Sequence, residues 1–375
     1  MHYLDNAATT RVLPEAAEAA VHAMCEGFGN PSSLHKMGIE ASHLLEDSRK
    51  TVASALGCLP EETYFTSCGT ESTNISLRGA AHLNRHKKGR IITTEIEHAA
   101  TLNTCKQLAA EGFDVVFLAP DETGHITPAA LEEALTEDTV LLSCQLVNNE
   151  IGTVQPVAEL GALLKAKAPG ALFHIDAVQG LCRVPLTPKK WNCDLMSVSG
   201  HKIGAPKGIG ALYVKKGLRL PPLMFGGGQE KGMRPGTEPL PNIAAFAKAC
   251  AIRMAHFDED YAHVAELAAY LKEQAAANLP DAVCNGEGDV PHVVNLSIPG
   301  CKSEVMLRVL EGDEVYVSSG SACSKGKQSG VLKALGLSKA RTDSAIRVSF
   351  APFNTKEDVD AFIAAAKKGV KMLRR

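Results

Sequence analysis

Three residues of this chain have types and surroundings suited to covalent chemistry. Lys202 ends the polar turn Ser199-Gly200-His201-Lys202, where its amine is placed to form a Schiff base. Asp176 follows an apolar run and is placed to keep a pyridine nitrogen protonated. Cys323 lies in a loop of glycine and serine, where a thiol can act as a mobile nucleophile. Together these residues indicate pyridoxal phosphate chemistry on a sulfur-containing substrate.

Further polar motifs follow predicted strands and would reach the same site. Residues 66–72 open a helix whose backbone N–H groups, with Gly69 and the Thr70 hydroxyl, suit a phosphate; an ordinary helix N-cap is the alternative. His98 can stack on a cofactor ring and move protons, or serve a structural purpose. The adjacent amides of Asn148 and Asn149 are costly to bury unpaired, which favours a polar site over an Asx turn.

Four other side chains complete the predicted site. Gln179 can donate to the phenolic oxygen of the ring, and Ser199 and His201 can reach the phosphate. Arg347 can form a bidentate pair with a substrate carboxylate, although a salt bridge at a sheet edge is the alternative. The first three residues also have alternative interpretations without a function. Asp176 could form a structural salt bridge, Lys202 could be a solvated surface lysine, and Cys323 could be an incidental loop cysteine.

The order of apolar runs predicts how these residues are positioned. Short β-branched runs alternate with helical patterns between residues 62 and 214, which predicts a doubly wound, mostly parallel sheet with helices on both faces. Ligands of such sheets bind at the carboxyl ends of the strands. The predicted strands are 63–66, 90–94, 114–118, 140–147, 172–176, 195–198 and 211–214. The predicted helices among them are 99–111, 128–135 and 157–167.

The remainder predicts a smaller α+β unit. A Gly/Pro-rich segment at 221–241 precedes one long helical pattern, residues 242–278. Strands are predicted at 292–297, 315–318 and 345–349, and helices at 303–310 and 359–373. We therefore expect a large cofactor-binding domain over residues 15–245. Residues 1–14 and 246–375 should form the small domain that carries the cysteine loop.

Composition excludes several classes of protein. The 375 residues are 45% hydrophobic and 22% charged, with a net charge of −3, so neither a nucleic-acid nor a membrane partner is expected. The eleven cysteines include no CxxC pair, which argues against a disulfide framework and a zinc ribbon and suits a reducing cytosol. The first residues show no signal peptide, and no apolar run reaches the roughly 18 residues of a membrane span. We expect a cytoplasmic protein.

The ordered motifs resemble the NifS/IscS-like cysteine desulfurases of the class V aminotransferase group, nearly end to end. The matching runs include Tyr3-Leu4-Asp5-Asn6-Ala7-Ala8-Thr9-Thr10, Asn148-Asn149-Glu150-Ile151-Gly152, Asp176-Ala177-Val178-Gln179, Ser199-Gly200-His201-Lys202 and Ser318-Ser319-Gly320-Ser321-Ala322-Cys323. The resemblance implies a homodimer of fold-type I, the pyridoxal phosphate-dependent transferase fold, with active sites near the subunit interface. Cys68 and Pro235 depart from the family pattern, which usually has glycine and serine there.

Carried over residue by residue, the resemblance implies a role for each position. Lys202 binds pyridoxal 5'-phosphate, His98 is the ring-stacking acid or base, and Cys323 carries the persulfide. Cofactor contacts are implied for Gly69, Thr70, His98, Asn149, Asp176, Gln179, Ser199, His201, Lys202 and, toward the partner subunit, Thr237. Asn149 and Arg347 are implied to bind the substrate carboxylate.

The activity expected from these roles is sulfur removal from L-cysteine, which gives L-alanine and a persulfide on Cys323. That sulfur would pass to an acceptor protein for iron–sulfur cluster assembly or tRNA thiolation. Two alternatives remain open at this point. One is a related class V enzyme, a selenocysteine lyase or an aminotransferase, and the other is a non-catalytic interaction protein.

Overall fold

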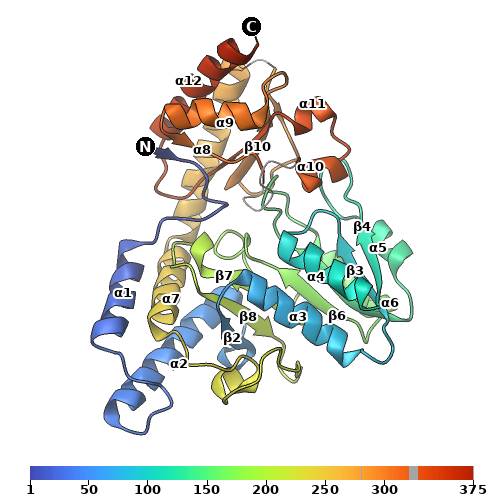
Figure 1. The fold of residues 1–375 in the computed structure, drawn as a ribbon, viewed down its shortest axis with the longest axis vertical. Helices are drawn as coiled ribbons and strands as arrows, with labels where there is room; N and C mark the ends of the chain where they lie inside the picture. Colours follow the sequence, from blue (N-terminus) through green and yellow to red (C-terminus); the bar gives the residue numbers. More distant parts are fainter. Residues whose placement is uncertain (280, 321–327, 375) are drawn as a thin grey trace.

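A seven-stranded sheet carries the strand ends at which the polar motifs lie (Figure 1). The structure, a computed structural model, describes residues 1–279, 281–320 and 328–374. The strand order is β2-β8-β7-β6-β5-β3-β4. The strands are β2 (Thr63–Thr66), β3 (Arg90–Thr94), β4 (Asp114–Leu118), β5 (Thr139–Gln145), β6 (Leu172–Asp176), β7 (Leu195–Ser199) and β8 (Gly210–Val214). All seven predicted strands are present.

One strand of this sheet runs against the rest. β8 is antiparallel to both of its neighbours, β7 and β2. Only residues 200–209 separate β7 from β8, and a parallel crossover needs a dozen residues or more. The short connection therefore turns the chain back on itself and leaves Ser199 and the turn after it at the same edge as Asp176.

Helices cover both faces of the sheet, as predicted for a doubly wound fold. Neighbouring side chains of one strand point to opposite faces. Ile91 packs with α3 and α4, whereas Ile92 belongs to the larger core that includes α1, α2 and α5 to α7. These helices are α1 (Pro14–Cys25), α2 (Lys36–Leu56), α3 (Gly69–Leu83), α4 (Ala99–Ala110), α5 (Pro128–Ala134), α6 (Val157–Lys167) and α7 (Leu240–Ala255), with short 3-10 turns η1 (Pro60–Glu62), η2 (Gly200–Lys202) and η3 (Gln229–Gly232).

A second core forms around two small sheets near both ends of the chain. β12-β10-β9 is antiparallel, and β1 pairs with β11 in parallel. The elements are β1 (His2–Tyr3), α8 (Phe257–Asn278), β9 (Val283–Cys284), β10 (Val293–Ser297), α9 (Ser303–Gly312), β11 (Val315–Tyr316), α10 (Gly330–Ala334), α11 (Lys339–Thr342), β12 (Ala345–Ser349) and α12 (Lys356–Leu373). No described helix is both long enough and apolar enough to cross a membrane.

The prediction of one long helix over residues 242–278 is wrong, because the structure has two helices there, α7 and α8. The backbone leaves the helical region at His256, which ends α7 and precedes α8. Acidic residues in the first turn of α8 favour a new helix N-terminus there, and Arg253 of α7 pairs with Asp260 of α8 at 2.9 Å. Buried residues of α7 as far as Cys250 belong to the larger core. The domain division at residue 245 lies inside α7 and remains a prediction.

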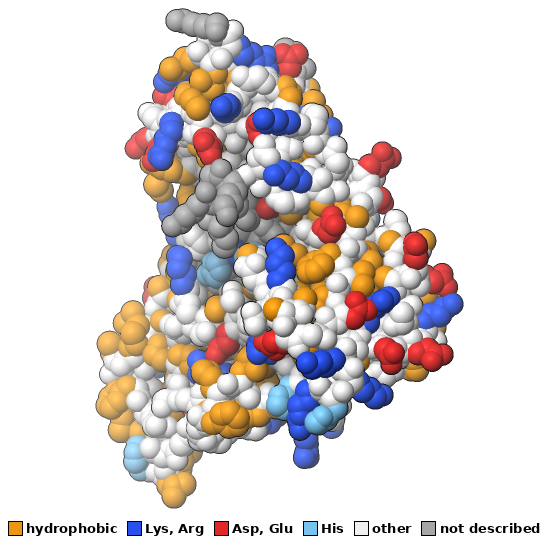
Figure 2. Space-filling model, turned by 45° about the vertical axis from the view of Figure 1, so that its right-hand side comes forward, with side chains coloured by type: hydrophobic (Ala, Val, Ile, Leu, Met, Phe, Trp, Pro, Cys, Tyr) orange, Lys and Arg blue, Asp and Glu red, His pale blue; other side chains and the backbone are white. Residues whose placement is uncertain are grey.

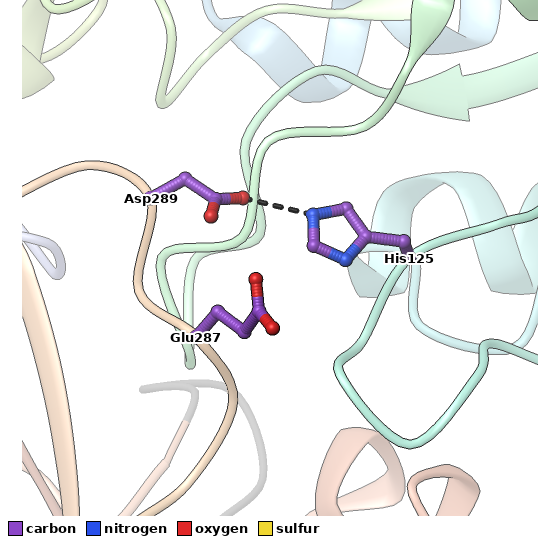
Figure 3. A group of neighbouring side chains, drawn as sticks. All are labelled: His125, Glu287 and Asp289. Carbon is purple, nitrogen blue, oxygen red and sulfur yellow. Dashed lines mark hydrogen bonds and ion pairs between the residues drawn. The ribbon is translucent and has the colours of Figure 1, made fainter.

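A polar contact joins the two sheet units beside the strand ends (Figure 3). His125 precedes α5, and its Nε2 lies 2.9 Å from Oδ2 of Asp289, between β9 and β10. The same carboxylate oxygen accepts the backbone N–H of Val154 at 2.7 Å, and Glu287 points toward the histidine. These hydrogen bonds therefore connect the loop after Asn149 to the sheet unit that contains β9 and β10.

Candidate active site

A cavity of about 250 Å³ opens at the carboxyl ends of β5, β6 and β7. The predicted site residues that line it are Gly69, Thr70, His98, Asn149, Asp176, Gln179, Ser199, His201, Lys202 and Arg347. Thr237 is exposed just before α7 and does not line this cavity. Cys323 lies outside the described residues. The strand ends thus bring together side chains that are far apart in the sequence.

Lys202 reaches the cavity from the end of the turn after β7. Its Nζ donates to two backbone carbonyl oxygens, Ala7 O at 2.6 Å and Ala8 O at 2.7 Å. Both alanines also line the cavity. The N-terminal segment is therefore a wall of the site, a role that we did not assign from the sequence. The run from Asp5 to Thr10, quoted for the family resemblance, was the available signal.

Asp176 is the last residue of β6 and is almost completely buried. Its Oδ1 accepts the backbone N–H of Val178 at 3.0 Å. Burial raises the pKa of Asp176, while the nearby His98, the Val178 N–H and Lys202 lower it. A carboxylate placed among these groups can hold a cationic ring nitrogen.

His98 lies between β3 and α4 and forms the N-cap of that helix. Its Nδ1 accepts the backbone N–H of Ala100 at 3.1 Å, which leaves the ring proton on Nε2 in the neutral form. Burial lowers the pKa of His98, so the ring is uncharged at neutral pH. A neutral imidazole at this position can accept or return a proton.

The part of the cavity wall formed by the start of α3 and Ser199 has the features of a phosphate site. α3 begins at Gly69, and its N-cap residue, Cys68, makes no side-chain capping bond to the first turn. The hydroxyl of Ser199 is buried without a hydrogen-bond partner among the described residues. A Cβ on Gly69 would lie 2.8 Å from a methyl group of Val178. A helix N-terminus without a side-chain cap, a buried hydroxyl with no partner among the described residues and a closely packed glycine fit a phosphate.

His201 borders the same wall. Its Nδ1 lies 3.2 Å from the hydroxyl oxygen of Thr9. Burial, with the charges of Lys202 and Lys207, lowers the pKa of His201 to about 4. The ring is therefore neutral near pH 7, and it can offer a hydrogen bond to an anion without adding charge.

Gln179 and Arg347, which were predicted to contact the cofactor and the substrate, form hydrogen bonds with other residues of the protein. Gln179 donates from Nε2 to Ala7 O at 3.0 Å, and its Oε1 accepts from Arg183. Arg347 is 1% exposed and donates to Asn149 O and to Asp5 Oδ1, each at 2.8 Å. Its Nε is buried without a hydrogen-bond partner among the described residues. Sequence reasoning did not identify Asp5 or Arg183 as neighbours of the site.

Comparison with known proteins shows full-length likeness. The sequence pattern of the family described as "Aminotransferase class-V" matches residues 2–362. The chain is 40% identical to the cysteine desulfurase IscS of Methanosarcina thermophila, over 99% of this chain and 92% of that relative. It is also 40% identical to a cysteine desulfurase of Nostoc sp., over 99% and 93% of the two chains.

Solved structures agree with these sequence matches. A protein described as NifS-like superposes with a TM-score of 0.93, at 37% identity and with 99% of each chain covered. SspA in complex with cysteine has a TM-score of 0.84 at 34% identity, covering 95% of this chain and 100% of SspA. The predicted fold class, activity and pyridoxal phosphate cofactor are confirmed, and the cavity residues fit that cofactor. The chain belongs to the class V aminotransferase family and is, within it, a pyridoxal phosphate-dependent cysteine desulfurase.

Proposed function

We propose that the cavity removes sulfur from L-cysteine through the residues that line it, and that Cys323 receives the sulfur. The observation that carries this proposal is the convergence of Lys202, Asp176 and His98 in one cavity that the N-terminus of α3 also lines. When bound, pyridoxal phosphate supplies an electron sink for negative charge on the α-carbon of the substrate. The remaining steps belong to residues of this chain.

The cofactor would be held at its reactive carbon, its ring and its phosphate. Lys202 would bind it covalently, and Asp176 would pair with its ring nitrogen, with His98 over the ring. Gln179 would contact the phenolic oxygen after exchanging its present bond to Ala7 O. Gly69, Thr70, Ser199 and His201 would hold the phosphate, which satisfies the orphaned Ser199 hydroxyl.

Substrate orientation would depend on Arg347 and Asn149. Arg347 is held by Asp5 and by the backbone oxygen of Asn149, so its guanidinium is fixed before cysteine arrives. Its unpartnered Nε is a donor for the substrate carboxylate. A fixed cation at one end of the substrate places the α-proton toward Lys202.

Proton and sulfur transfer follow from this placement. Lys202 Nζ would be released as an amine when the amine of cysteine takes its place on the cofactor, and it would then remove the α-proton, while His98 would exchange protons with the reacting groups. The Cys323 thiolate attacks the substrate sulfur. The bond between the β-carbon and sulfur breaks, a sulfur–sulfur bond forms, and the electron pair of the broken bond goes to the β-carbon. The β-carbon then takes up one proton and the α-carbon takes back the proton held by Lys202, which gives alanine.

The test is mass spectrometry after brief exposure of the holoenzyme to cysteine. Wild type should gain one sulfur on Cys323, with the ten other cysteines largely unmodified, and should release alanine. Cys323→Ser should keep its cofactor and its binding of cysteine but make no alanine. Cys58→Ser is the matched control, because that thiol is half-buried and does not line the cavity. Added sulfur on another cysteine, or alanine at the wild-type rate from Cys323→Ser, contradicts the assignment.

A homodimer is the second part of the proposal. Leu34 and Phe225 are 95% and 90% exposed. Ser32, close to Leu34 in the sequence, and Gln229, close to Phe225, line the same groove. Figure 2 shows hydrophobic side chains gathered at the lower end of the molecule. Thr237 follows the Phe225 segment, where it could reach the phosphate of a partner subunit. Exposed apolar patches of this kind mark protein interfaces.

Light scattering at several concentrations tests the dimer. Wild type should have the mass of two chains, and Leu34→Glu with Phe225→Glu should shift the mass toward one chain. Met372→Glu is the control, because that methionine is also exposed but lies on α12. A monomeric wild type, or an unaffected double variant, would rule out this interface.

The product persulfide needs an acceptor. We propose transfer to a protein of iron–sulfur cluster assembly or tRNA thiolation, in the cytoplasm. The described cysteines are all free, which suits a reducing compartment. Incubation of persulfidated enzyme with candidate carriers, followed by mass measurement of both proteins, identifies the acceptor; sulfur that stays on the enzyme with every carrier of both pathways argues against this destination.

A further inference from the structure

The residue before His98 is a carboxylic acid buried in the core. Glu97 is 4% exposed. Its Oε1 accepts hydrogen bonds from the backbone N–H of Gln145 at 2.8 Å and from the Thr94 hydroxyl at 2.9 Å. Its Oε2 is buried with no hydrogen-bond partner among the described residues. A negative charge on such a group would be poorly solvated, which favours the neutral acid.

Other groups close to Glu97 do not stabilise its charged form either. The buried thiols of Cys105 and Cys144 lie close enough to feel its charge, and neither supplies a cation. The carboxyl of Asp176 acts on Glu97 electrostatically, and its charge has the same sign. Burial, the largest cause, and Asp176 raise the pKa of Glu97 to about 8, and they outweigh the hydrogen bonds from Gln145 and Thr94, which lower it. Glu97 is therefore uncharged at neutral pH.

The hydrogen bonds of Glu97 join the segment that carries His98 to the strand beside Asp176. Gln145 is the register partner of Asp176 in the parallel pair of β5 and β6. The side chain of Gln145 also donates to Ile96 O at 2.6 Å. Residues 94–97 are thus tied to the end of β5 at several points, and His98 begins α4 directly afterwards.

We propose that Glu97 is an uncharged positioning residue for His98 and Asp176, and that its ionisation disables the site. A charged Glu97 would place a second anion beside Asp176 and would favour protonation of that residue. Asp176 would then pair less well with a cationic ring nitrogen. This goes beyond the roles proposed above and depends only on the cofactor-dependent activity, not on Cys323 or the dimer.

The first test compares how kcat depends on pH in the holoenzymes of wild type, Glu97→Gln and Glu95→Gln. Glu97→Gln keeps the size of the side chain and cannot ionise. Its kcat at pH 7 should stay within about threefold of wild type, because the neutral amide resembles the neutral acid. Wild type should lose activity above pH 8, together with a change in cofactor absorbance, and Glu97→Gln should lose that alkaline change. Glu95→Gln, an exposed glutamate two residues earlier, should follow wild type.

A second test needs no cofactor. The folded protein binds a proton on Glu97 between the ordinary pKa of 4.5 and about 8, where the unfolded chain has released it. Its contribution to stability is therefore present at acid pH and lost as the pH rises to about 8. Urea unfolding of the cofactor-free protein should show this loss for wild type and Glu95→Gln, and a smaller one for Glu97→Gln.

A third variant separates position from charge. Glu97→Met fills the space but accepts no hydrogen bond, so kcat at pH 7 should fall about tenfold or more, with little change in KM. Wild-type kcat in Glu97→Met would overturn the positioning role. A loss beyond about a hundredfold in Glu97→Gln at pH 7 would show that the charge is required. Identical alkaline profiles and stability slopes in wild type and Glu97→Gln would show that Glu97 does not titrate there.

Discussion

Arg347 donates from Nη2 to Oδ1 of Asp5 at 2.8 Å and so joins the two ends of the chain within the site. Asp5 lies just after β1, and Arg347 is in the middle of β12. Burial raises the pKa of Asp5, and Arg347 lowers it. The pair fixes the guanidinium at the cavity wall, where its function depends on orientation.

Asp5→Asn should weaken both the fold and substrate binding. Loss of one partner from a buried pair costs roughly 3–5 kcal/mol, and we expect about 2 kcal/mol here because the Asp5 side chain is 20% exposed. The KM for cysteine should rise more than kcat falls, since Arg347 is no longer oriented. Urea unfolding and steady-state kinetics measure these effects. Asp47→Asn breaks an exposed pair with Lys50 and should change neither quantity; an equal response of both variants contradicts the prediction.

Lys202→Ala should purify without covalently bound cofactor. Loss of both the attachment point and the proton-transfer group should lower alanine formation by about 10³-fold or more. Absorbance after borohydride treatment and an alanine assay measure the two losses. Lys190→Ala, a surface lysine before β7, should keep both properties. Normal turnover by Lys202→Ala would remove this residue from the mechanism.

Asp176→Asn should retain some cofactor and lose turnover. The neutral amide cannot keep the ring nitrogen protonated, so kcat should fall on the order of 10²-fold. KM should change less, because the lost interaction strengthens mainly in the transition state. Asp194→Asn serves as a control for buried carboxylates outside the cavity, since Asp194 pairs with Lys165 and Lys215. Unchanged kcat in Asp176→Asn would make its role structural.

Buried histidines should lower the free energy of unfolding at acid pH, because they remain neutral in the folded protein while the unfolded chain takes up protons. His174 lies between the hydroxyl oxygens of Ser143 and Ser197, at 2.8 and 2.9 Å, and burial lowers its pKa to about 3. The unfolded chain takes up a proton near the ordinary value of 6.5, so this contribution is intact above pH 6.5 and is lost as the pH falls toward 3.

At pH 5 the loss from His174 alone is about 2 kcal/mol relative to pH 7. His201, whose pKa is lowered to about 4, adds to the same trend. Urea unfolding at both pH values measures the change. His174→Gln should show a smaller decrease than wild type, whereas exposed His22→Gln should show the full decrease. A decrease of the same size in wild type and His174→Gln would contradict the prediction, because the opposite pH trend expected from Glu97 is common to both proteins and cancels in this comparison.

The sequence by itself determined the strands of the large sheet and the chemistry of the site. Strand β3 has a continuous β-branched run from Ile91 to Thr94, and the helix at Lys356–Leu373 has a clear helical period, so local pattern and final structure agree. Polar motifs directly after strands predicted the cavity at the carboxyl ends, because parallel strands bring those ends to one edge. The types of Lys202, Asp176 and His98 then limited the chemistry.

Tertiary structure decided the contacts between segments far apart in the chain. The bonds from Lys202 to the carbonyls of Ala7 and Ala8, and from Arg347 to Asp5, join residues nearly 200 to more than 340 positions apart. Sequence patterns repeat over a few residues and do not specify such pairings, which depend on how the two cores are assembled. The same holds for the buried Glu97, because its protonation is set by surrounding segments that lie elsewhere in the chain.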